Sequence, residues 1–194
     1  MTLILASASS IRAAMLDAAG VAHSVDPARV DESAVKDGHV GDDAELASAL
    51  AKAKALDTGA RHSEKWIIGG DSILSVEGRR FDKPASCDEA AEHLREFSGK
   101  EMRLTSAVAL ATGGRIDWWH AEAAVLHVRQ LSDDFIHTYL GAEWPAVGQC
   151  VGVFRMEGRG VTLFGSVKGD HFTILGMPLL PLLGALRDRG LAAA

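Results

Sequence analysis

Two short stretches of the 194-residue chain carry residue types suited to phosphate chemistry. Asp71 ends the apolar run 66–70, and Lys83 follows twelve residues later. The ends of buried strands are where α/β proteins tend to expose catalytic side chains. A carboxylate and an ammonium group at one such edge suit metal-assisted attack on a phosphoanhydride. Together with a serine-rich start to the first helix, they predict an enzyme that acts on a nucleoside triphosphate.

That first helix offers a second group of polar side chains. Ser7, Ser9 and Arg12 lie where the helix is expected to begin. A helix dipole favours an anion at this position, and an arginine in the first turn adds a planar fork of donors. Serine caps are also common, so the serines alternatively act only as caps, with Arg12 in solvent. This segment alone leaves both interpretations open.

Glu32 and Asp71 are the candidate metal-binding carboxylates. Magnesium keeps several waters, so one or two carboxylates plus the substrate phosphates suffice. Asp71 is also a candidate for orienting or deprotonating the attacking water. Glu32 taken alone is better explained as a solvated loop acid. An unpaired Asp71 at the end of an apolar run would be costly, which favours a function for it.

Lys54 and Lys83 are candidate phosphate contacts. Lys54 lies on a predicted helix two residues after Lys52, and their side chains point in different directions around it. Taken alone, Lys54 is best explained as an exposed helix lysine. Lys83 precedes a proline, which restricts it to an extended backbone, so Lys83 is the better positioned candidate.

The elements that must position these residues alternate between strand and helix. Strands are expected at 3–5, 66–76, 102–112, 122–129 and 172–175, with an extended stretch at 21–30 and a strand–turn–strand unit over 151–164. Helices are expected at 11–19, 43–56, 86–99, 132–140 and 178–187. The run 66–76 is expected to form two strands hinged near Asp71, and the tail 191–194 to fray. The alternation predicts an α/β fold with a partly parallel sheet.

Composition excludes several function classes. The net charge of −6 argues against a broad contact with nucleic acid, which normally needs a basic face. Cys87 and Cys150 lie far apart, which indicates neither a zinc knuckle nor a disulfide framework and fits a reducing cytoplasm. No signal peptide and no run of about 20 apolar residues is found, so no membrane partner is expected. Serine-hydrolase and P-loop motifs are also missing.

The order of these signals resembles the Maf family of nucleoside triphosphate pyrophosphatases over nearly the whole chain. The matching pieces are Leu5-Ala6-Ser7-Ala8-Ser9 with Arg12 and Leu16, Asp31-Glu32, Leu50-Ala51 with Lys54-Ala55, Gly70-Asp71, Lys83-Pro84, Ser98-Gly99, Gly152, and Gly176-Met177-Pro178-Leu179. The resemblance implies a single domain, 1–194, with a mixed twisted sheet in two lobes around a deep cleft, as in inosine-triphosphatase-like proteins. It also implies a homodimer that hydrolyses a nucleotide to the monophosphate and pyrophosphate with Mg²⁺ or Mn²⁺.

The resemblance assigns roles by position. Residues expected to contact the substrate, mainly its phosphates, are Ser7, Ser9, Arg12, Lys54, Ser72 and Lys83. Glu32 and Asp71 are expected to hold the metal and activate water, with Asp71 as the favoured catalytic base, and Lys54 and Lys83 are also expected to be catalytic. Such a site stabilises charge on the transferring phosphorus mainly by placement and electrostatics.

Departures from the family pattern bear on the substrate. Ser10-Ile11-Arg12 stands where many members have Pro-Arg-Arg, and the family branch acting on 7-methyl-GTP also lacks that first arginine. Glu157 stands where the thymidine- and uridine-triphosphate branch usually has glutamine, and a carboxylate can accept hydrogen bonds from a guanine edge. Ser106 replaces an expected glycine.

We therefore expect a house-cleaning enzyme that removes 7-methyl-GTP or another modified nucleotide, with Glu157 as the base reader. The alternatives are dTTP, UTP or inosine triphosphate as substrate, or a non-catalytic nucleotide-binding regulator of cell division. Retention of both candidate carboxylates and both candidate lysines speaks against lost catalysis.

Overall fold

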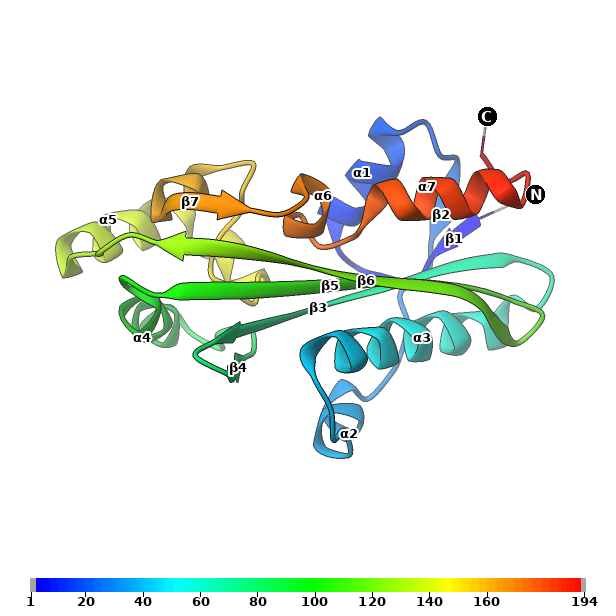
Figure 1. Ribbon diagram of the computed structural model, residues 1–194, viewed down its shortest axis with the longest axis horizontal. Coiled ribbons are helices and arrows are strands. Elements are labelled where there is room, and N and C mark those ends of the chain that lie inside the picture. Colours follow the sequence, from blue (N-terminus) through cyan, green and yellow to red (C-terminus); the bar gives the residue numbers. More distant parts are fainter. Residues whose placement is uncertain (1–2, 193–194) are drawn as a thin grey trace. The chain divides into compact units, whose positions relative to one another are not determined.

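The computed structural model describes residues 3–192 of the protein (Figure 1). The strands are β1 Leu3–Leu5, β2 His23–Val25, β3 Trp66–Val76, β4 Arg79–Phe81, β5 Glu101–Thr112, β6 Arg115–Val128 and β7 Phe164–Lys168. The helices are α1 Ser10–Ala18, α2 Glu32–Asp37, α3 Asp43–Arg61, α4 Cys87–Phe97, α5 Asp133–Glu143, α6 His171–Ile174 and α7 Leu179–Asp188, with 3₁₀-helices η1 Ala146–Gln149 and η2 Arg159–Leu163. Strand neighbours follow the order β2-β1-β3-β5-β6-β7, and β4 pairs with β3.

The chain forms two compact units. Unit 1 contains residues 1–72, 105–122 and 170–194, and unit 2 contains residues 73–104 and 123–169. The division falls inside β3, between Ser72 and Ile73. That the two units form one functional domain with a deep cleft stays a prediction.

Unit 1 is built on parallel strands. β1 pairs in parallel with β2 and with β3, with Leu5 opposite Val25 and Ile68. Parallel sheets are normally covered on both faces, and here α1 and α7 lie on one face and α3 on the other (Figure 1). The core under α1 and α7 consists of Leu3, Leu5, Met15, Leu16, Val21, Ile68, Val108, Leu110, Met177, Leu179, Leu182, Ala185 and Leu186.

Unit 2 contains the antiparallel pairs. β4 pairs with the end of β3, and β7 pairs with the end of β6. Its two long helices begin after serine caps, since Ser86 accepts a hydrogen bond from the Glu89 N–H and Ser132 accepts one from the Phe135 N–H. With parallel and antiparallel strands and covering helices, the predicted mixed α/β fold is confirmed.

The structure corrects three predicted elements. β3 is one continuous strand rather than two strands hinged near Asp71. Residues 151–163 form turns and η2 rather than a strand–turn–strand unit, because Val153 takes a φ of 55° and breaks the extended run. Residues 171–174 form α6 rather than a strand, because the Asp170 carboxylate accepts hydrogen bonds from two following N–H groups and caps a helix.

Smaller differences concern the ends of elements. α3 continues past its predicted end at residue 56 to Arg61, and α2 and β4 were not predicted at all. The predicted fraying of 191–194 falls partly outside the described residues.

Gly69 allows α3 to lie directly on β3. A Cβ atom at this position would come within 2.1 Å of the Ala51 carbonyl oxygen and 2.8 Å of the Ala55 nitrogen, both in the α3 backbone. Asp71 lies two residues further on the same side of the strand. Lys54 belongs to the same turn of α3 as these contacts, so the close approach brings its side chain toward Asp71.

We predict that Gly69→Ala lowers the free energy of unfolding by about 2–3 kcal/mol, because the added methyl group must push a helix backbone off the strand. Urea unfolding followed by circular dichroism measures the change. Gly141→Ala is the matched control, since a Cβ there meets nothing within 4 Å. Equal stability of Gly69→Ala and the unmodified protein would contradict this packing.

Candidate active site

The centre of the candidate site is one lysine between two carboxylates. The Lys54 Nζ atom lies 2.6 Å from the Asp71 Oδ1 atom and 2.8 Å from the Glu32 Oε1 atom. The side chains of Lys54 and Asp71 are only 12% and 10% exposed, whereas that of Glu32 is 44% exposed. Lys54 is therefore not an exposed helix lysine, which is the interpretation that its sequence context alone favoured.

The strand order explains the position of Asp71. Leu5, the last residue of β1, pairs with Ile68, and Asp71 follows three residues later on β3. Asp71 therefore lies just beyond the carboxyl end of a parallel partner, the edge where α/β proteins place ligand sites. Lys52 points away from this edge, and its Nζ atom lies 3.4 Å from the centre of the Trp119 ring. The two lysines diverge as their spacing predicted.

Arg12 organises the neighbouring serines. Its Nε atom donates to the Gly176 carbonyl oxygen at 2.8 Å, and its Nη1 and Nη2 atoms donate to the Ser7 and Ser72 Oγ atoms, each at 3.1 Å. Arg12 is buried, so it is not in solvent. Burial lowers the pKa of its guanidinium below the usual value, and the nearby carboxylates of Asp71 and Glu32 oppose that shift.

Ser9 lies at the N-cap position of α1, but its side chain makes no capping hydrogen bond. Its backbone N–H instead donates to the Ser7 Oγ atom at 3.3 Å. The hydroxyl of Ser9 therefore has no capping role, and its contact with phosphate stays a prediction.

A residue that sequence reasoning passed over, Ser106, continues this network. Its hydroxyl lies 2.9 Å from the Ser72 Oγ atom and donates to the Thr173 carbonyl oxygen at 2.8 Å. Ser106 is fully buried, and buried hydroxyls are costly without partners. The only signal in the sequence was the serine in place of an expected glycine. The structure gives that serine a role in holding Ser72.

Lys83 and Glu157 belong to unit 2 and both lie near Cys150. Burial is the main cause that raises the pKa of the Cys150 thiol, Glu157 raises it further, and Lys83 and Arg155 oppose the increase. Their approach to the Lys54 centre of unit 1 stays a prediction.

The segment that carries Glu157 is fixed to α5. The Tyr139 hydroxyl donates to the Val153 carbonyl oxygen at 2.9 Å, and the Arg155 Nη2 atom donates to the Glu143 Oε2 atom at 3.0 Å. Glu143 is buried, so breaking its pair would leave a charge without compensation. The backbone that leads to Glu157 is therefore held in place at Val153 and at Arg155.

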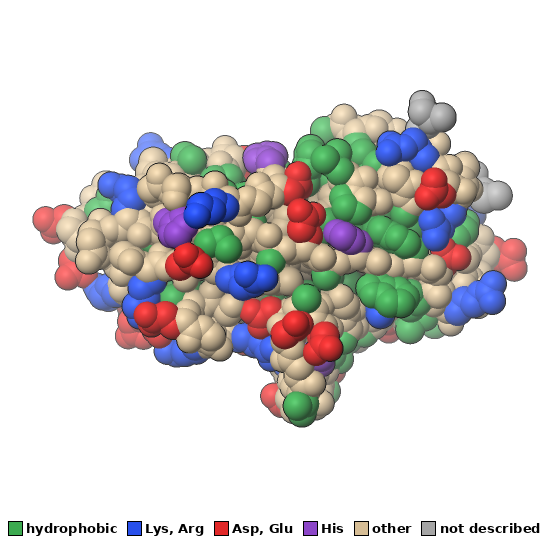
Figure 2. All heavy atoms as spheres, viewed as in Figure 1, with side chains coloured by type: hydrophobic (Ala, Val, Ile, Leu, Met, Phe, Trp, Pro, Cys, Tyr) green, Lys and Arg blue, Asp and Glu red, His purple; other side chains and the backbone are tan. Residues whose placement is uncertain are grey.

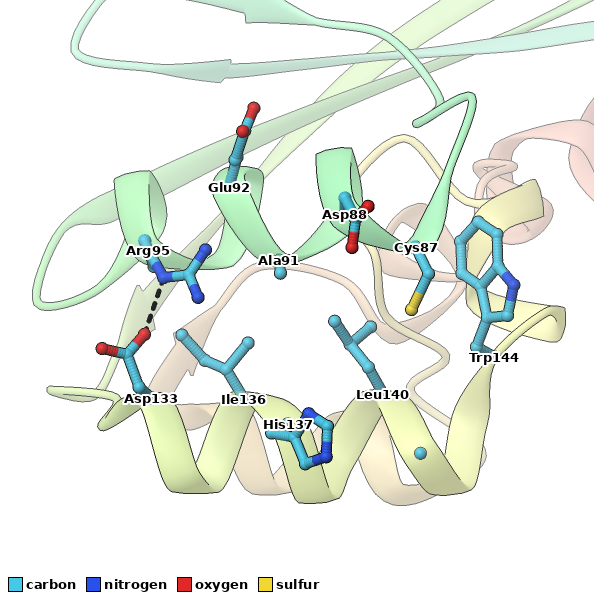
Figure 3. Close-up of a pocket in the computed structure, with 11 residues that line it drawn as sticks. Cys87, Asp88, Ala91, Glu92, Arg95, Asp133, Ile136, His137, Leu140 and Trp144 are labelled. Carbon is cyan, nitrogen blue, oxygen red and sulfur yellow. Dashed lines mark hydrogen bonds and ion pairs between the residues drawn. The ribbon is translucent and has the colours of Figure 1, made fainter.

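A cavity of about 690 Å³ lies elsewhere in unit 2, between α4 and α5 (Figure 3). Cys87, Arg95 and Asp133 are among its lining residues, and Arg95 and Asp133 form an ion pair across it at 2.6 Å. None of the predicted site residues lines this cavity. It also lacks the pairing of two carboxylates with one lysine, so we do not assign the phosphate chemistry to it.

Charges on the face shown in Figure 2 are interspersed, with acidic and basic side chains as neighbours.

Within residues 3–192, no three side chains of His, Cys, Asp or Glu form a group able to hold a metal ion by themselves. In the same part of the chain, every helix is too short or too polar to cross a bilayer.

The fold and the edge residues define an α/β protein whose candidate site lies beyond the carboxyl end of β1, where such proteins tend to bind ligands. The family model described as Maf-like protein matches residues 2–189, and the chain belongs to the Maf family. It is 45% identical over 191 residues to the nucleoside triphosphate pyrophosphatase of Granulibacter bethesdensis, covering 97% of each chain. It is 44% identical over 193 residues to the 7-methyl-GTP pyrophosphatase of Rhizobium etli, covering 97% of this chain and 96% of that protein.

Among solved structures, the chain is similar to a nucleoside-triphosphatase, or dITP/XTP pyrophosphatase, from Mycobacterium abscessus. The TM-score is 0.44 at 14% identity, over 68% of this chain and 76% of that one.

We predict that Lys54→Met lowers the free energy of unfolding by about 2 kcal/mol and the Tm by roughly 4–8 °C, because two close carboxylates lose their shared cation. Thermal unfolding at neutral pH measures the loss. Lys54→Met/Glu32→Gln should recover part of it, since only one charge then remains. Lys100→Met is the control, because it breaks a surface pair with Glu77 whose worth is at most about 1 kcal/mol. A Lys54→Met protein as stable as this control would contradict the bridge.

Proposed function

We propose that this protein is a nucleoside triphosphate pyrophosphatase that hydrolyses its substrate to the nucleoside monophosphate and pyrophosphate. The observation that carries the proposal is the convergence of Glu32 and Asp71 on Lys54 at the strand edge. It occurs in a chain 40–45% identical, over nearly its whole length, to nucleotide pyrophosphatases. We propose that both units act as one domain, 1–194.

The two carboxylates fit a divalent metal. Because Glu32 and Asp71 both reach one Nζ atom, their oxygens converge, and two carboxylates plus substrate phosphates suit Mg²⁺ or Mn²⁺. When bound, the cation supplies Lewis-acid polarisation of the phosphoryl oxygens. Within residues 3–192, no third acidic or histidine side chain completes a metal-binding group here, so substrate phosphates would supply the remaining ligands.

In the proposed reaction, Asp71 accepts a proton from a water molecule whose oxygen forms a bond to the α-phosphorus. The bond from that phosphorus to the bridging oxygen breaks, and pyrophosphate leaves with the electron pair. Lys54 and Lys83 balance charge on the phosphates. Ser7, Ser9, Arg12 and Ser72 contact and orient the same groups, and the Arg12 contacts to Ser7 and Ser72 support this by holding both hydroxyls in place.

For the base, we propose that Glu157 reads a guanine edge and that 7-methyl-GTP or a related modified nucleotide is preferred. The relative from Rhizobium etli supports this choice, as does the rigid attachment of the 150–160 segment to α5. Pyrimidine triphosphates and inosine triphosphate are the competing substrates. A non-catalytic regulator of cell division would bind nucleotide without turnover.

The proposed setting is a homodimer in the cytoplasm. The two free cysteines, Cys87 and Cys150, suit a reducing compartment. No nucleic-acid or membrane partner is proposed.

We predict that Asp71→Asn lowers kcat for pyrophosphate release by about 10²- to 10⁴-fold, the usual effect of losing a general base. The assay follows pyrophosphate from a panel of nucleotides with Mg²⁺ or Mn²⁺. Asp133→Asn makes the same chemical change at an exposed ion pair of unit 2 and should retain full rate. Full activity in Asp71→Asn would remove this residue from the mechanism.

We predict that Glu157→Gln lowers kcat/KM for 7-methyl-GTP about 10-fold or more relative to UTP, because a hydrogen bond to a charged acceptor becomes a neutral one. The same panel measures both ratios, and Glu92→Gln at the α4–α5 cavity serves as control. An unchanged ratio would exclude Glu157 as the base reader while leaving the reaction itself intact.

A further inference from the structure

Glu32 is the first residue of α2, a six-residue helix without a buried residue. α2 contacts α3, and the segment that leads into α2 is attached to the same helix. That segment is 26–31, which connects β2 to α2.

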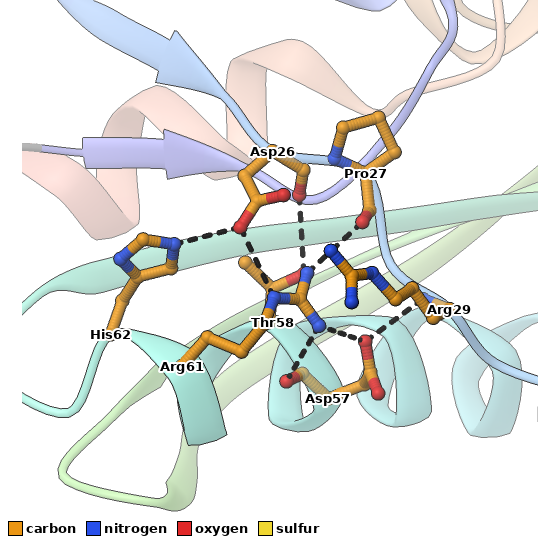
Figure 4. Close-up of polar contacts among 7 residues, drawn as sticks. All are labelled: Asp26, Pro27, Arg29, Asp57, Thr58, Arg61 and His62. Carbon is orange, nitrogen blue, oxygen red and sulfur yellow. Dashed lines mark hydrogen bonds and ion pairs between the residues drawn. The ribbon is translucent and has the colours of Figure 1, made fainter.

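One arginine near the end of α3 binds this segment at two points (Figure 4). The Arg61 Nε atom donates to the Asp26 Oδ2 atom at 3.2 Å, and its Nη2 atom donates to the Pro27 carbonyl oxygen at 3.0 Å. The other donors of Arg61 return to α3, to the Asp57 Oδ2 atom at 2.7 Å and the Thr58 Oγ1 atom at 3.2 Å. A single guanidinium thus joins the segment to the helix.

The partners on α3 also bind the segment directly. The Asp57 Oδ2 atom accepts a hydrogen bond from the Arg29 N–H at 2.9 Å, and the Thr58 hydroxyl donates to the Asp26 carbonyl oxygen at 3.2 Å. The His62 Nε2 atom lies 2.7 Å from the Asp26 Oδ2 atom. Asp26, Pro27 and Arg29 are therefore all attached to the last turns of α3.

These attachments share one face of α3 with the reactive lysine. Asp57 and Thr58 lie three and four residues after Lys54, and Arg61 lies four and three residues after them, so the four residues form a single stripe along the helix, called here the α3 stripe. The segment runs along it from Arg61 toward Lys54. Glu32 is the third residue after the Arg29 attachment, a reach of at most about 10 Å. Fixing Arg29 therefore confines the position of Glu32.

The charges support an ionised network. The pKa of Asp26 is lowered first by His62 and then by Arg61, and the pKa of Asp57 is lowered first by the Arg29 N–H and then by Arg61. Exposed ion pairs contribute little to global stability. All the contacts of this network act on the one segment that leads into Glu32, so its consequence for the site is the placement of that segment.

We propose that Arg61 is a positioning residue, which holds segment 26–29 on the α3 stripe so that Glu32 faces Lys54 and Asp71. The inference rests on the proposed function in taking Glu32 as a metal-side carboxylate. Arg61 itself touches neither carboxylate of that pair, so its effect passes through Glu32.

The test is a double-mutant cycle of Arg61→Met and Glu32→Gln. With Glu32 present, Arg61→Met should raise the Mn²⁺ concentration needed for half-maximal pyrophosphate release at least fivefold. With Glu32→Gln, adding Arg61→Met should change that concentration less than twofold. Arg61→Lys, which keeps a charge but not the fork, should fall between Arg61→Met and the unmodified protein. Equal effects of Arg61→Met in both backgrounds would overturn the proposal.

Hydrogen exchange of the metal-free proteins supplies a readout without turnover. Arg61→Met should accelerate exchange in peptides covering residues 26–38 at least fivefold, whereas Arg95→Met, which breaks the exposed pair with Asp133, should leave them unchanged. Unchanged exchange in Arg61→Met would also overturn the proposal. If the unmodified protein releases no pyrophosphate from any nucleotide but its exchange responds as expected, the proposed function fails and the positioning role stands.

Discussion

The site depends on the direct contact of α3 with β3 at Gly69. With no side chain between them, the helix backbone lies close enough for the Lys54 ammonium to reach Asp71 at 2.6 Å. Both side chains are nearly excluded from water, where unpaired charges are costly and an ion pair is screened less. The ammonium also binds Glu32, which keeps two like charges close together. This arrangement brings two carboxylates and one ammonium group together at the edge of the sheet.

Successive side chains of β3 point to opposite faces of the sheet, so its candidate site residues are divided between the two faces. Asp71 points toward α3, and Ser72, the next residue, points toward Arg12. Arg12 is buried, so its charge requires partners. Gly176, Ser7 and Ser72 accept its hydrogen bonds, and Asp71 and Glu32 favour its charged form. The two faces are therefore linked electrostatically as well as through the backbone.

Local signals in the sequence predicted most of the elements that carry these residues, whereas the resemblance to the Maf family was needed to single out Glu32 and Lys54. Apolar runs located β1 and β3, and serine caps located α4 and α5. The errors lie where tertiary contacts decide the backbone. Residues 151–163 have the apolar pattern of a strand, but the Tyr139 and Glu143 contacts hold them in turns. Arg61 was missed because its partners at 26–29 lie more than thirty residues away along the chain and no spacing rule joins them.

The α3 stripe links Arg61 to Lys54 through the rigid geometry of one helix. In an α-helix, positions three and four apart keep a fixed relation to one another, so the distance from Arg61 to Lys54 is set at about 10 Å. The segment 26–29 is attached to this helix face by hydrogen bonds, and Glu32 lies three residues after its end. A flexible loop would make Glu32 lose conformational entropy each time it met Lys54. Because the segment is attached to the helix, this conformational entropy is already lost during folding, before a substrate binds. A site that is preorganised in this way can reach a high rate with few charged groups.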